Sequence, residues 1–325
     1  RTARLRALIY SRSMRVGIIG TGWGRTHCGT FRAAGCEIVA LAGRRLDDVT
    51  AAAAAESVPR ATTDPKELED CDVIVVASPT DTHLEFLRRF KHKSVLCEKP
   101  LLGVPPAPDV LDGLDGPPKF VNYAFPFLDS VQALDVALAE GRLGRVRRVL
   151  LTVGVNFPAR KSPAQWFVDV AAHPLSWLLH RFGPLNCVGH YTGDGEAAVS
   201  LVMAGSSVQL DVALYPLPAT GIRIGLDLVG DRACTRLAGG YQPDRQWWFD
   251  PIDLGDERLT DGEFSTDEDI WFRANRRSVD LFCRVLEGRI GISEAEALGA
   301  FGLRKALGME TMLAPLLARH RGRPG

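Results

Sequence analysis

The sequence lacks a long apolar run and a surplus of either charge. Its 325 residues contain 39 Lys and Arg against 39 Asp and Glu, so the formal net charge is zero. Nucleic-acid-binding domains are typically basic, so we expect no nucleic-acid partner. No run approaches the ~18 apolar residues that a membrane-spanning helix needs, so we also expect no membrane partner.

The cysteine pattern excludes a further class of site. The seven cysteines are scattered, and none forms a C-x-x-C pair or alternates with histidine at the spacing of a metal site. We therefore expect no metal, and we predict a reduced, cytoplasmic location. Residues 1–13 lack the apolar region and cleavage site of a signal peptide, so we interpret them as an N-terminal extension.

From residue 14 onward the sequence alternates short apolar runs with helix-like segments. The runs MRVGIIG, CEIVALAG, CDVIVVASP and SVLCEKP predict strands buried on both faces of a sheet. The segments THCGTFRAAG, LDDVTAAAAAES and DTHLEFLRRFKH predict helices between them. This alternation predicts parallel βαβ units and hence a doubly wound Rossmann domain of the α/β class over residues 14–120.

The second half of the chain has a different pattern of predicted elements. Residues 101–118 are rich in Pro, Gly and Asp, and they predict a loop with a short helix near a domain boundary. From residue 145, extended runs separated by glycine-containing turns predict a mostly antiparallel sheet. Helices are predicted over 127–144, 166–183, 270–288 and 292–314. We therefore expect a second α/β domain over residues 121–325.

The segment GTGWG, residues 20–24, follows the first predicted strand. Gly20 and Gly22 match the first two glycines of a G-x-G-x-x-G motif, which allow a tight turn and let backbone N–H groups approach a pyrophosphate. Arg25 occupies the third glycine position and Gly24 stands one residue early, so we expect a local path that departs from the usual one. The place of the motif in a βαβ unit predicts a dinucleotide cofactor.

The end of the second predicted strand bears on which dinucleotide binds. A site that prefers NAD usually has an acidic residue there for the ribose hydroxyls. This chain has Arg44 and Arg45 instead, and guanidinium groups match phosphate oxygens. The pair favours NADP(H), with NAD(H) as the alternative. The competing interpretation is two arginines that only face solvent.

The stretch SVLCEKPL, residues 94–101, joins an apolar strand to an acid, a base and a proline. The carboxyl ends of strands in an open parallel sheet face the ligand crevice. Lys99 is therefore either the ordinary polar end of a strand or an amine held for chemistry. An ammonium group at that place can hydrogen-bond a reacting oxygen and relay its proton.

The sequence resembles the glucose–fructose oxidoreductase/inositol dehydrogenase (Gfo/Idh/MocA) family in three segments. They are the GTGWG loop, residues 71–101, and DVAAH at 169–173. The second is the most specific, because a strand ending in Ser-Pro is followed by a Thr-x-x-His helix start and by Glu-Lys-Pro one strand later. The resemblance implies an N-terminal Rossmann domain, and a C-terminal domain whose open sheet binds substrate and supports a homo-oligomer, either a dimer or a tetramer.

The resemblance also implies roles for individual residues. Lys99 corresponds to a lysine beside the nicotinamide and the substrate, and Asp169 and His173 correspond to the family's Asp and His four residues apart. Residues i and i+4 share one face of a helix, so we expect His173 to be the general acid/base and Asp169 to bind and orient substrate. The residues expected at the cofactor are Gly20, Gly22, Trp23, Gly24, Arg25, Arg44, Arg45, Ser78, Pro79, Thr80, His83, Glu98 and Lys99.

The chain departs from the family's pattern beside Asp169. The family usually has glycines before this Asp, whereas this chain has Gln165-Trp166-Phe167, so we expect a bulkier and less polar substrate pocket. Trp166 is interpreted either as a side chain that stacks on substrate or as part of the core, and Tyr123 as a residue that lines the substrate cleft. With Asp169 and His173, these form the predicted substrate set.

Together these features predict an NADP(H)-dependent oxidoreductase. It would move a hydride to or from a small-molecule substrate, a keto-sugar, nucleotide-linked sugar or cyclitol, in the biosynthesis of a specialised metabolite. Imine reduction is an alternative, because the same acid can protonate a nitrogen after hydride transfer. A second alternative is a non-catalytic NADP(H)-binding sensor or scaffold, against which the intact set Lys99, Asp169 and His173 argues.

Overall fold

The computed structural model describes residues 13–103, 107, 109–156, 161–193, 196–203, 208–266 and 268–318. These residues form two compact units, neither of which is continuous in sequence. The first contains the described residues of Arg1–Leu102, Ala107–Tyr123 and Asn275–Leu307. The second contains those of Gly103–Pro106, Ala124–Ala274 and Gly308–Gly325. The predicted N-terminal extension lies outside the described residues except for its last residue.

The first unit is built on a seven-stranded sheet. Its strand order is β17 (Phe301–Gly302), β6 (Lys119–Asn122), β5 (Ser94–Glu98), β4 (Val73–Val76), β1 (Arg15–Ile19), β2 (Glu37–Ala42) and β3 (Ala61–Thr62). Every neighbouring pair is parallel except β17 with β6. The central strands are buried almost throughout, which explains their continuous apolar sequences. The predicted doubly wound domain is confirmed.

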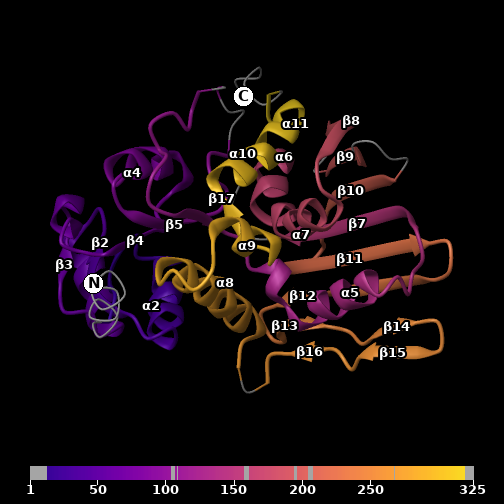
Figure 1. Cartoon of the computed structure of the whole chain (residues 1–325), viewed down its shortest axis with the longest axis horizontal. Helices are drawn as coiled ribbons and strands as arrows, with labels where there is room; N and C mark the ends of the chain where they lie inside the picture. The colour runs from indigo at the N-terminus through magenta and orange to yellow at the C-terminus, as the bar shows by residue number, and fades with distance from the viewer. Residues whose placement is uncertain are drawn as a thin grey trace, which may run out of the picture. The chain divides into compact units, whose positions relative to one another are not determined.

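Helices cover both faces of this sheet. They are α2 (Gly24–Ala33), α3 (Leu46–Ala55), α4 (His83–Arg89) and α9 (Ile292–Ala297), with the 3₁₀ helices η1 (Pro65–Leu68) and η2 (Thr80–Thr82). Figure 1 shows α4 on one face of the sheet and α2 on the other. From β1 to β2 the chain moves toward one edge of the sheet, and from β4 to β5 it moves toward the other edge. Because both crossovers are right-handed, their helices lie on opposite faces. The switch point between β1 and β4 is where open α/β sheets bind ligands.

The C-terminal part of the chain completes the first unit. Helices α8 (Ile270–Leu286) and α10 (Leu303–Met312) each begin in one unit and end in the other. Within the first unit, Sγ of Cys283 in α8 lies 3.8 Å from Sγ of Cys36, which precedes β2. The ring of Phe282 packs against Phe120 of β6 with centroids 5.5 Å apart. Helix α8 is therefore part of the packing of the Rossmann sheet.

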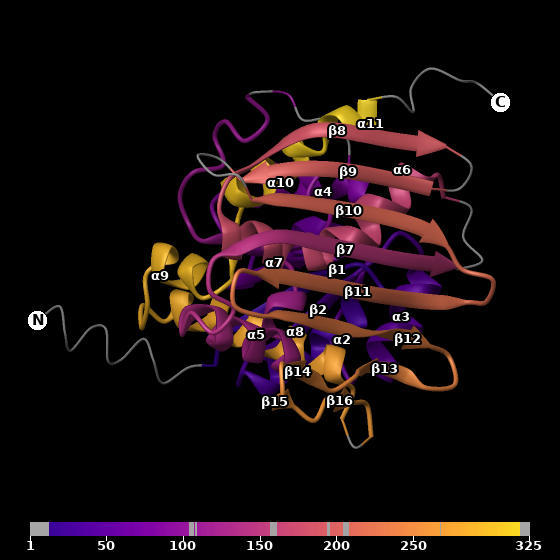
Figure 2. The same cartoon turned by 90° about the vertical axis from the view of Figure 1, so that its right-hand side faces the viewer.

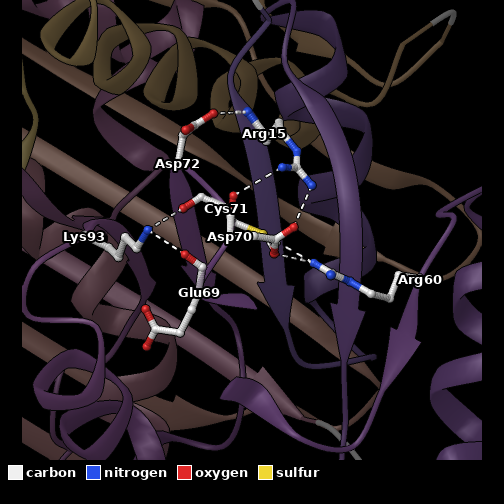
Figure 3. Close-up of polar contacts among 7 residues, drawn as sticks. All are labelled: Arg15, Arg60, Glu69, Asp70, Cys71, Asp72 and Lys93. Carbon is white, nitrogen blue, oxygen red and sulfur yellow. Dashed lines mark hydrogen bonds and ion pairs between the residues drawn. The ribbon is translucent and has the colours of Figure 1, made fainter. Parts of the chain in front are cut away.

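A polar cluster ties together the amino ends of the strands (Figure 3). Asp70 accepts hydrogen bonds from Nη2 of Arg60 at 2.6 Å and from Nη2 of Arg15 at 2.7 Å. The ammonium group of Lys93 donates to two backbone carbonyl oxygens of the turn before β4, at 2.8 and 2.9 Å. The side chains in the figure are those of Arg15, Arg60, Glu69, Asp70, Cys71, Asp72 and Lys93. The cluster occupies the amino ends of the strands, so a ligand would bind at the opposite edge of the sheet, where the strands have their carboxyl ends.

The second unit is built on a ten-stranded sheet. The main order is β15 (Glu257–Thr260), β14 (Ile252–Leu254), β12 (Cys234–Gln242), β11 (Gly221–Gly230), β7 (Val146–Asn156), β10 (Gln209–Pro216), β9 (Glu196–Met203) and β8 (Leu185–Gly193). Strand β13 (Gln246–Phe249) pairs with β12 and with β16 (Glu263–Phe264). Every pair is antiparallel except β7 with β10. The predicted mostly antiparallel sheet is confirmed.

One face of this sheet carries the helices of the second unit. The helices are η3 (Phe125–Phe127), α5 (Asp129–Ala139), α6 (Pro163–Trp166), the π-helix η4 (Phe167–Ala171), α7 (Ala172–Phe182) and α11 (Ala314–Ala318). Figure 2 shows β8, β9, β10, β7 and β11 side by side, with no helix drawn over the face turned to the viewer. Buried and more exposed residues alternate along β9 and β10, as expected for strands with one covered face.

Two predicted elements differ in the structure. The helix predicted over 292–314 is divided into α9, the short strand β17 and α10. Gly299 has a φ of 103°, which a continuing helix does not allow, and the chain turns there into the edge of the sheet. The short helix predicted within 101–118 is replaced by turns in the described part of that segment. Among the described residues, no helix has the length and hydrophobicity needed to cross a bilayer.

Candidate cofactor and active site

The first position of the glycine loop, residue 20, accepts only glycine. Gly20 has a φ of 118°, and a Cβ on it would lie 2.2 Å from the carbonyl oxygen of Ala77 at the end of β4. Its N–H donates to the carbonyl oxygen of Ala42 at 2.9 Å. The loop is therefore fixed between the carboxyl ends of β2 and β4, at the switch point of the sheet.

The surroundings of Gly22 are open, unlike those of Gly20. A Cβ on Gly22 would meet no heavy atom within 4 Å, and its φ lies outside the left-handed range. Helix α2 begins two residues later, and its N-cap residue, Trp23, makes no side-chain capping bond and is 47% exposed. The pyrophosphate of a dinucleotide can approach the backbone N–H groups at a helix N-terminus when no side chain blocks them, and this position meets that condition. The residues present therefore fit the predicted cofactor.

The three predicted cofactor arginines have different surroundings. Arg25 lies in the first turn of α2, because the helix begins at Gly24, and its Nε donates to Glu56 at 2.9 Å. Arg45 forms an ion pair with Asp48 at 3.1 Å. Arg44 is exposed two residues after β2. Arg44 is thus on the edge of the sheet where a ribose 2′-phosphate is expected.

The Ser-Pro-Thr segment after β4 is closed by its own hydrogen bonds. Oγ of Ser78 lies 2.6 Å from Oγ1 of Thr82, and that hydroxyl also donates to the carbonyl oxygen of Pro79 at 2.7 Å. His83 begins α4 and is buried, with Nε2 2.9 Å from the carbonyl oxygen of Ser78. The segment therefore holds a defined turn beside the glycine loop, at the carboxyl end of the neighbouring strand. Thr80 begins the 3₁₀ helix within this turn.

Lys99 directly follows β5 and is half-buried. Its N–H donates to Oε2 of Glu98 at 3.2 Å, and the peptide bond from Lys99 to Pro100 is cis. Because β5 neighbours β4 in the parallel sheet, Lys99 and Ser78 leave the sheet at the same edge. The predicted lysine thus stands at the carboxyl edge of the first unit, together with the glycine loop.

In the second unit, Asp169 lies in the π-helix η4. Its carboxylate forms an ion pair with Lys161, whose ammonium group also stands 4.9 Å from the ring centroid of Trp166. His173 follows in α7, so the turn between Asp169 and His173 is wider than an α-helical turn and the i, i+4 rule does not apply to it directly. Such π-turns occur often at functional sites.

His173 packs against a pair of stacked tryptophans within the second unit. Its ring stands edge-on to Trp271 with centroids 4.8 Å apart, and Trp271 stacks on Trp247 at 4.5 Å. Trp271 and Trp247, which are not among the predicted substrate residues, thus lie beside His173. Lys161 was also missed, because no periodic pattern links it to Asp169.

The predicted site residues are divided between the two units. Lys99, Tyr123 and all the predicted cofactor residues belong to the first unit, whereas Trp166, Asp169 and His173 belong to the second. The ring of Tyr123 is buried and packs against Phe301 with centroids 5.0 Å apart. The roles of Lys99, Asp169 and His173 as one catalytic set, and of Tyr123 and Trp166 at substrate, stay predictions. Among the residues that the structure describes, no group of three or more His, Cys, Asp or Glu is arranged to hold a metal ion.

Comparison with known proteins agrees with this architecture. Residues 14–110 match the oxidoreductase family with an NAD-binding Rossmann fold. No curated protein matches the chain in sequence.

Several solved structures share the fold over nearly the whole chain. The WlbA dehydrogenase from Bordetella pertussis, in complex with NADH and UDP-GlcNAcA, is 19% identical, with a TM-score of 0.74 over 95% of both chains. A putative myo-inositol dehydrogenase from Sinorhizobium meliloti 1021 is 19% identical, with a TM-score of 0.68 over 96% of this chain and 98% of that one. KijD10, a 3-ketoreductase from Actinomadura kijaniata in complex with NADP and TDP-benzene, is 18% identical, with a TM-score of 0.70 over 94% and 98%. At these identities the likeness shows a common fold.

Proposed function

We propose that this chain, whose residues 14–110 match the Gfo/Idh/MocA oxidoreductase family with an NAD-binding Rossmann fold, is an NADP(H)-dependent oxidoreductase of sugars. Its substrate class is a keto-sugar, a nucleotide-linked sugar or a cyclitol, used in the biosynthesis of a specialised metabolite by a cytoplasmic homo-oligomer. Relatives of the same fold that bind UDP-GlcNAcA or that are named a 3-ketoreductase support this class.

The observation that carries the proposal is that the glycine loop and Lys99 both lie at the carboxyl edge of the same parallel sheet. Gly22 leaves its backbone open to a ligand, and Lys99 follows the strand two places along the same sheet from β1. A bound nicotinamide cofactor supplies or accepts the hydride. The chain must then supply an amine or imidazole for the proton, and a carboxylate for a substrate hydroxyl.

In the proposed mechanism, Lys99 and His173 manage the proton. During reduction, the carbonyl carbon gains a hydride while its oxygen takes a proton from Nζ of Lys99 or from the imidazole of His173. In the oxidation direction the same groups accept the hydroxyl proton. Asp169 accepts a hydrogen bond from a substrate hydroxyl and orients the reacting carbon. Cationic donors also stabilise negative charge on the reacting oxygen.

The test is NADPH oxidation measured with a panel of keto-sugars, nucleotide-linked keto-sugars, inosose and cyclic imines. Turnover of a sugar or cyclitol ketone supports the proposal. Turnover of cyclic imines alone would replace it with imine reduction, which the aromatic surroundings of His173 favour as the second candidate. NADPH that binds without oxidation by any member of the panel would instead indicate a sensor or scaffold.

Arg44 carries the proposed preference for NADP(H). A guanidinium group binds the 2′-phosphate of NADPH, which NADH lacks. The Arg44→Ser variant is expected to raise the Kd for NADPH about tenfold or more and to leave the Kd for NADH within about threefold. Arg304→Ser, at an exposed ion pair with Asp115, is the matched control and should change neither Kd. Equal losses for both cofactors would contradict the preference.

A further inference from the structure

The residue before Lys99 is buried in a polar network. Glu98 is only 6% exposed, although it ends β5 at the edge where a cofactor contact was predicted. Its Oε1 accepts hydrogen bonds from Nε2 of His27 at 2.7 Å and from Nδ2 of Asn122 at 2.9 Å. Its Oε2 accepts the N–H of Lys99 at 3.2 Å. Both carboxylate oxygens are therefore used within the first unit.

Glu98 is charged in spite of its burial. Burial alone raises the pKa of Glu98, but the hydrogen bond and charge of His27, the hydrogen bond from Asn122 and the charge of Lys99 bring it down to about 2. At neutral pH the carboxylate carries no proton, so Nε2 of His27 must be the donor. The bond between His27 and Glu98 is thus charge-assisted, which makes it stronger than a neutral one.

Asn122 is itself fixed by helix α8. Its Nδ2 donates to Oδ1 of Asn275 at 2.7 Å as well as to Glu98, and its Oδ1 accepts from Oγ of Ser278 at 2.9 Å. Both amide protons of Asn122 are therefore used, and its oxygen has a donor. Oε1 of Glu98 accepts from two buried side chains, and Asn122 is itself fully bonded, so this oxygen is held in one place.

His83 holds the same segment from the other side. Its Nδ1 lies 2.9 Å from the carbonyl oxygen of Pro100, and its Nε2 lies 2.9 Å from the carbonyl oxygen of Ser78. The ring is buried and joins the turn after β4 to the segment after β5. A neutral imidazole has one N–H, so His83 donates to one of these two carbonyl oxygens and contacts the other. The two residues flanking Lys99 therefore both contact buried side chains, Glu98 through its own carboxylate and Pro100 through His83.

We propose that Glu98, with its partners His27 and Asn122, and His83 are positioning residues for Lys99. This inference rests on the proposed function, because it assumes that Lys99 acts on the substrate. An ammonium group on a four-carbon stem is flexible, so its reach is set by the backbone that carries it. A supporting shell that fixes this backbone preserves the reacting geometry, and a displacement of about 1 Å can cost about a hundredfold in rate.

The test uses two isosteric or near-isosteric variants and one matched control. Glu98→Gln removes the charge that binds His27, and His83→Gln removes the ring that joins Ser78 to Pro100. The control is Glu69→Gln, which alters an exposed pair with His92 at 2.9 Å in the same unit. Thermal unfolding shows which variants fold, and either test variant alone can decide the question.

One readout does not depend on turnover. Lysines are methylated with ¹³C-formaldehyde, and the resonance of Lys99 is identified by its absence in Lys99→Arg. The resonance is expected to shift or broaden in Glu98→Gln and in His83→Gln and to stay at its wild-type position in Glu69→Gln. The Lys99 resonance can be measured even if no member of the substrate panel is turned over. A failure of the positioning proposal is therefore distinguishable from a failure of the proposed function.

The second readout separates positioning from binding. With a substrate from the panel, kcat is expected to fall about tenfold or more in both test variants, while the substrate KM and the NADPH Kd stay within about threefold. An increase in the NADPH Kd with kcat unchanged would mean that Glu98 and His83 bind the cofactor directly, and would overturn the proposal. A wild-type Lys99 resonance in folded Glu98→Gln and His83→Gln would overturn it as well.

Discussion

At the scale of single residues, two glycines of one loop differ in their surroundings. A Cβ on Gly20 meets the carbonyl oxygen of Ala77 within the protein, whereas a Cβ on Gly22 meets nothing. We expect Gly20→Ala to lower the free energy of unfolding by about 2 kcal/mol or more, because of both the clash and the positive φ. We expect Gly22→Ala to unfold as the wild type does and to raise the Kd for NADPH about tenfold or more.

These two substitutions form a matched pair, because each adds one methyl group to the same loop. Urea unfolding and the intrinsic fluorescence change on NADPH titration measure the two effects. If Gly22→Ala binds NADPH as tightly as the wild type, the pyrophosphate does not lie against this residue.

The amine of Lys99 is the second prediction at this scale. Lys99→Ala is expected to lower turnover about a hundredfold, as loss of a positioned proton donor does, while NADPH still binds within about threefold of wild type. Stopped-flow NADPH oxidation and a binding titration measure the two quantities. Lys66→Ala, an exposed lysine at η1, is the control. Full turnover by Lys99→Ala would remove this residue from the mechanism.

At the scale of elements, Asp70 links the amino ends of the strands in a pH-dependent way. The hydrogen bond from Arg60, with help from Arg15, lowers the pKa of Asp70 from 3.8 to about 2 despite partial desolvation. A lowered carboxyl pKa adds stability that is fully present above pH 3.8 and is lost as the pH falls through about 2. The side chain is 43% exposed, so solvent screens the effect.

Asp70→Asn should therefore lower the urea midpoint at pH 7, and the difference from wild type should disappear as the pH approaches 2. Urea titrations at a series of pH values measure this difference. Asp112→Asn, an exposed turn residue, should show no such trend. A difference that grows toward acidic pH would have the wrong sign for the assigned pKa.

Four of the parallel strands, β1, β2, β4 and β5, were predictable because each is buried on both faces and therefore reads as a continuous apolar run, whereas β3 and β6 were not predicted. The glycine loop and the strand end at Lys99 were predictable for the same reason, since they are the boundaries of those runs. The strands after β11 were not predicted. Of these, β13, β14, β15 and β16 are only two to four residues long and show little periodicity.

The supporting contacts of the site could not be predicted from sequence. His27 is 71 residues from Glu98, and Asn275 is 153 residues from Asn122, so no local pattern connects them. The π-turn that carries Asp169 also gives no signal, because every other residue of that turn is apolar and no spacing marks the extra residue. Hydrogen bonds between distant segments depend on the fold itself.

At the scale of the whole molecule, we expect the predicted homo-oligomer to form through the face of the ten-stranded sheet that carries none of the described helices. Its central row has small side chains, since Thr152 of β7 pairs with Ala213 of β10 and with Gly225 of β11. Leu150 on β7 is 38% exposed. A row of small residues on a broad sheet allows close face-to-face packing of two sheets.

We therefore expect the wild type to have the mass of a dimer or tetramer in light scattering after size exclusion. Ala213→Arg places a charge at the centre of this face and should reduce the mass to a smaller species. Ala54→Arg adds the same side chain on the exposed face of α3 and should leave the assembly intact. A wild-type protein with the mass of one chain would refute the prediction.

The Rossmann sheet is completed by residues that come late in the chain. Strand β17 forms its edge against β6, and Asn275–Leu307 belong to the same compact unit as the glycine loop. A ribosome makes the chain from its amino end, so the six parallel strands β1 to β6 emerge long before the segment that covers the edge of β6. During translation that edge is open to other nascent chains, which is the state in which a chaperone would bind. Translation that stops before residue 275 leaves the sheet without its last strand and without the helix that anchors Asn122.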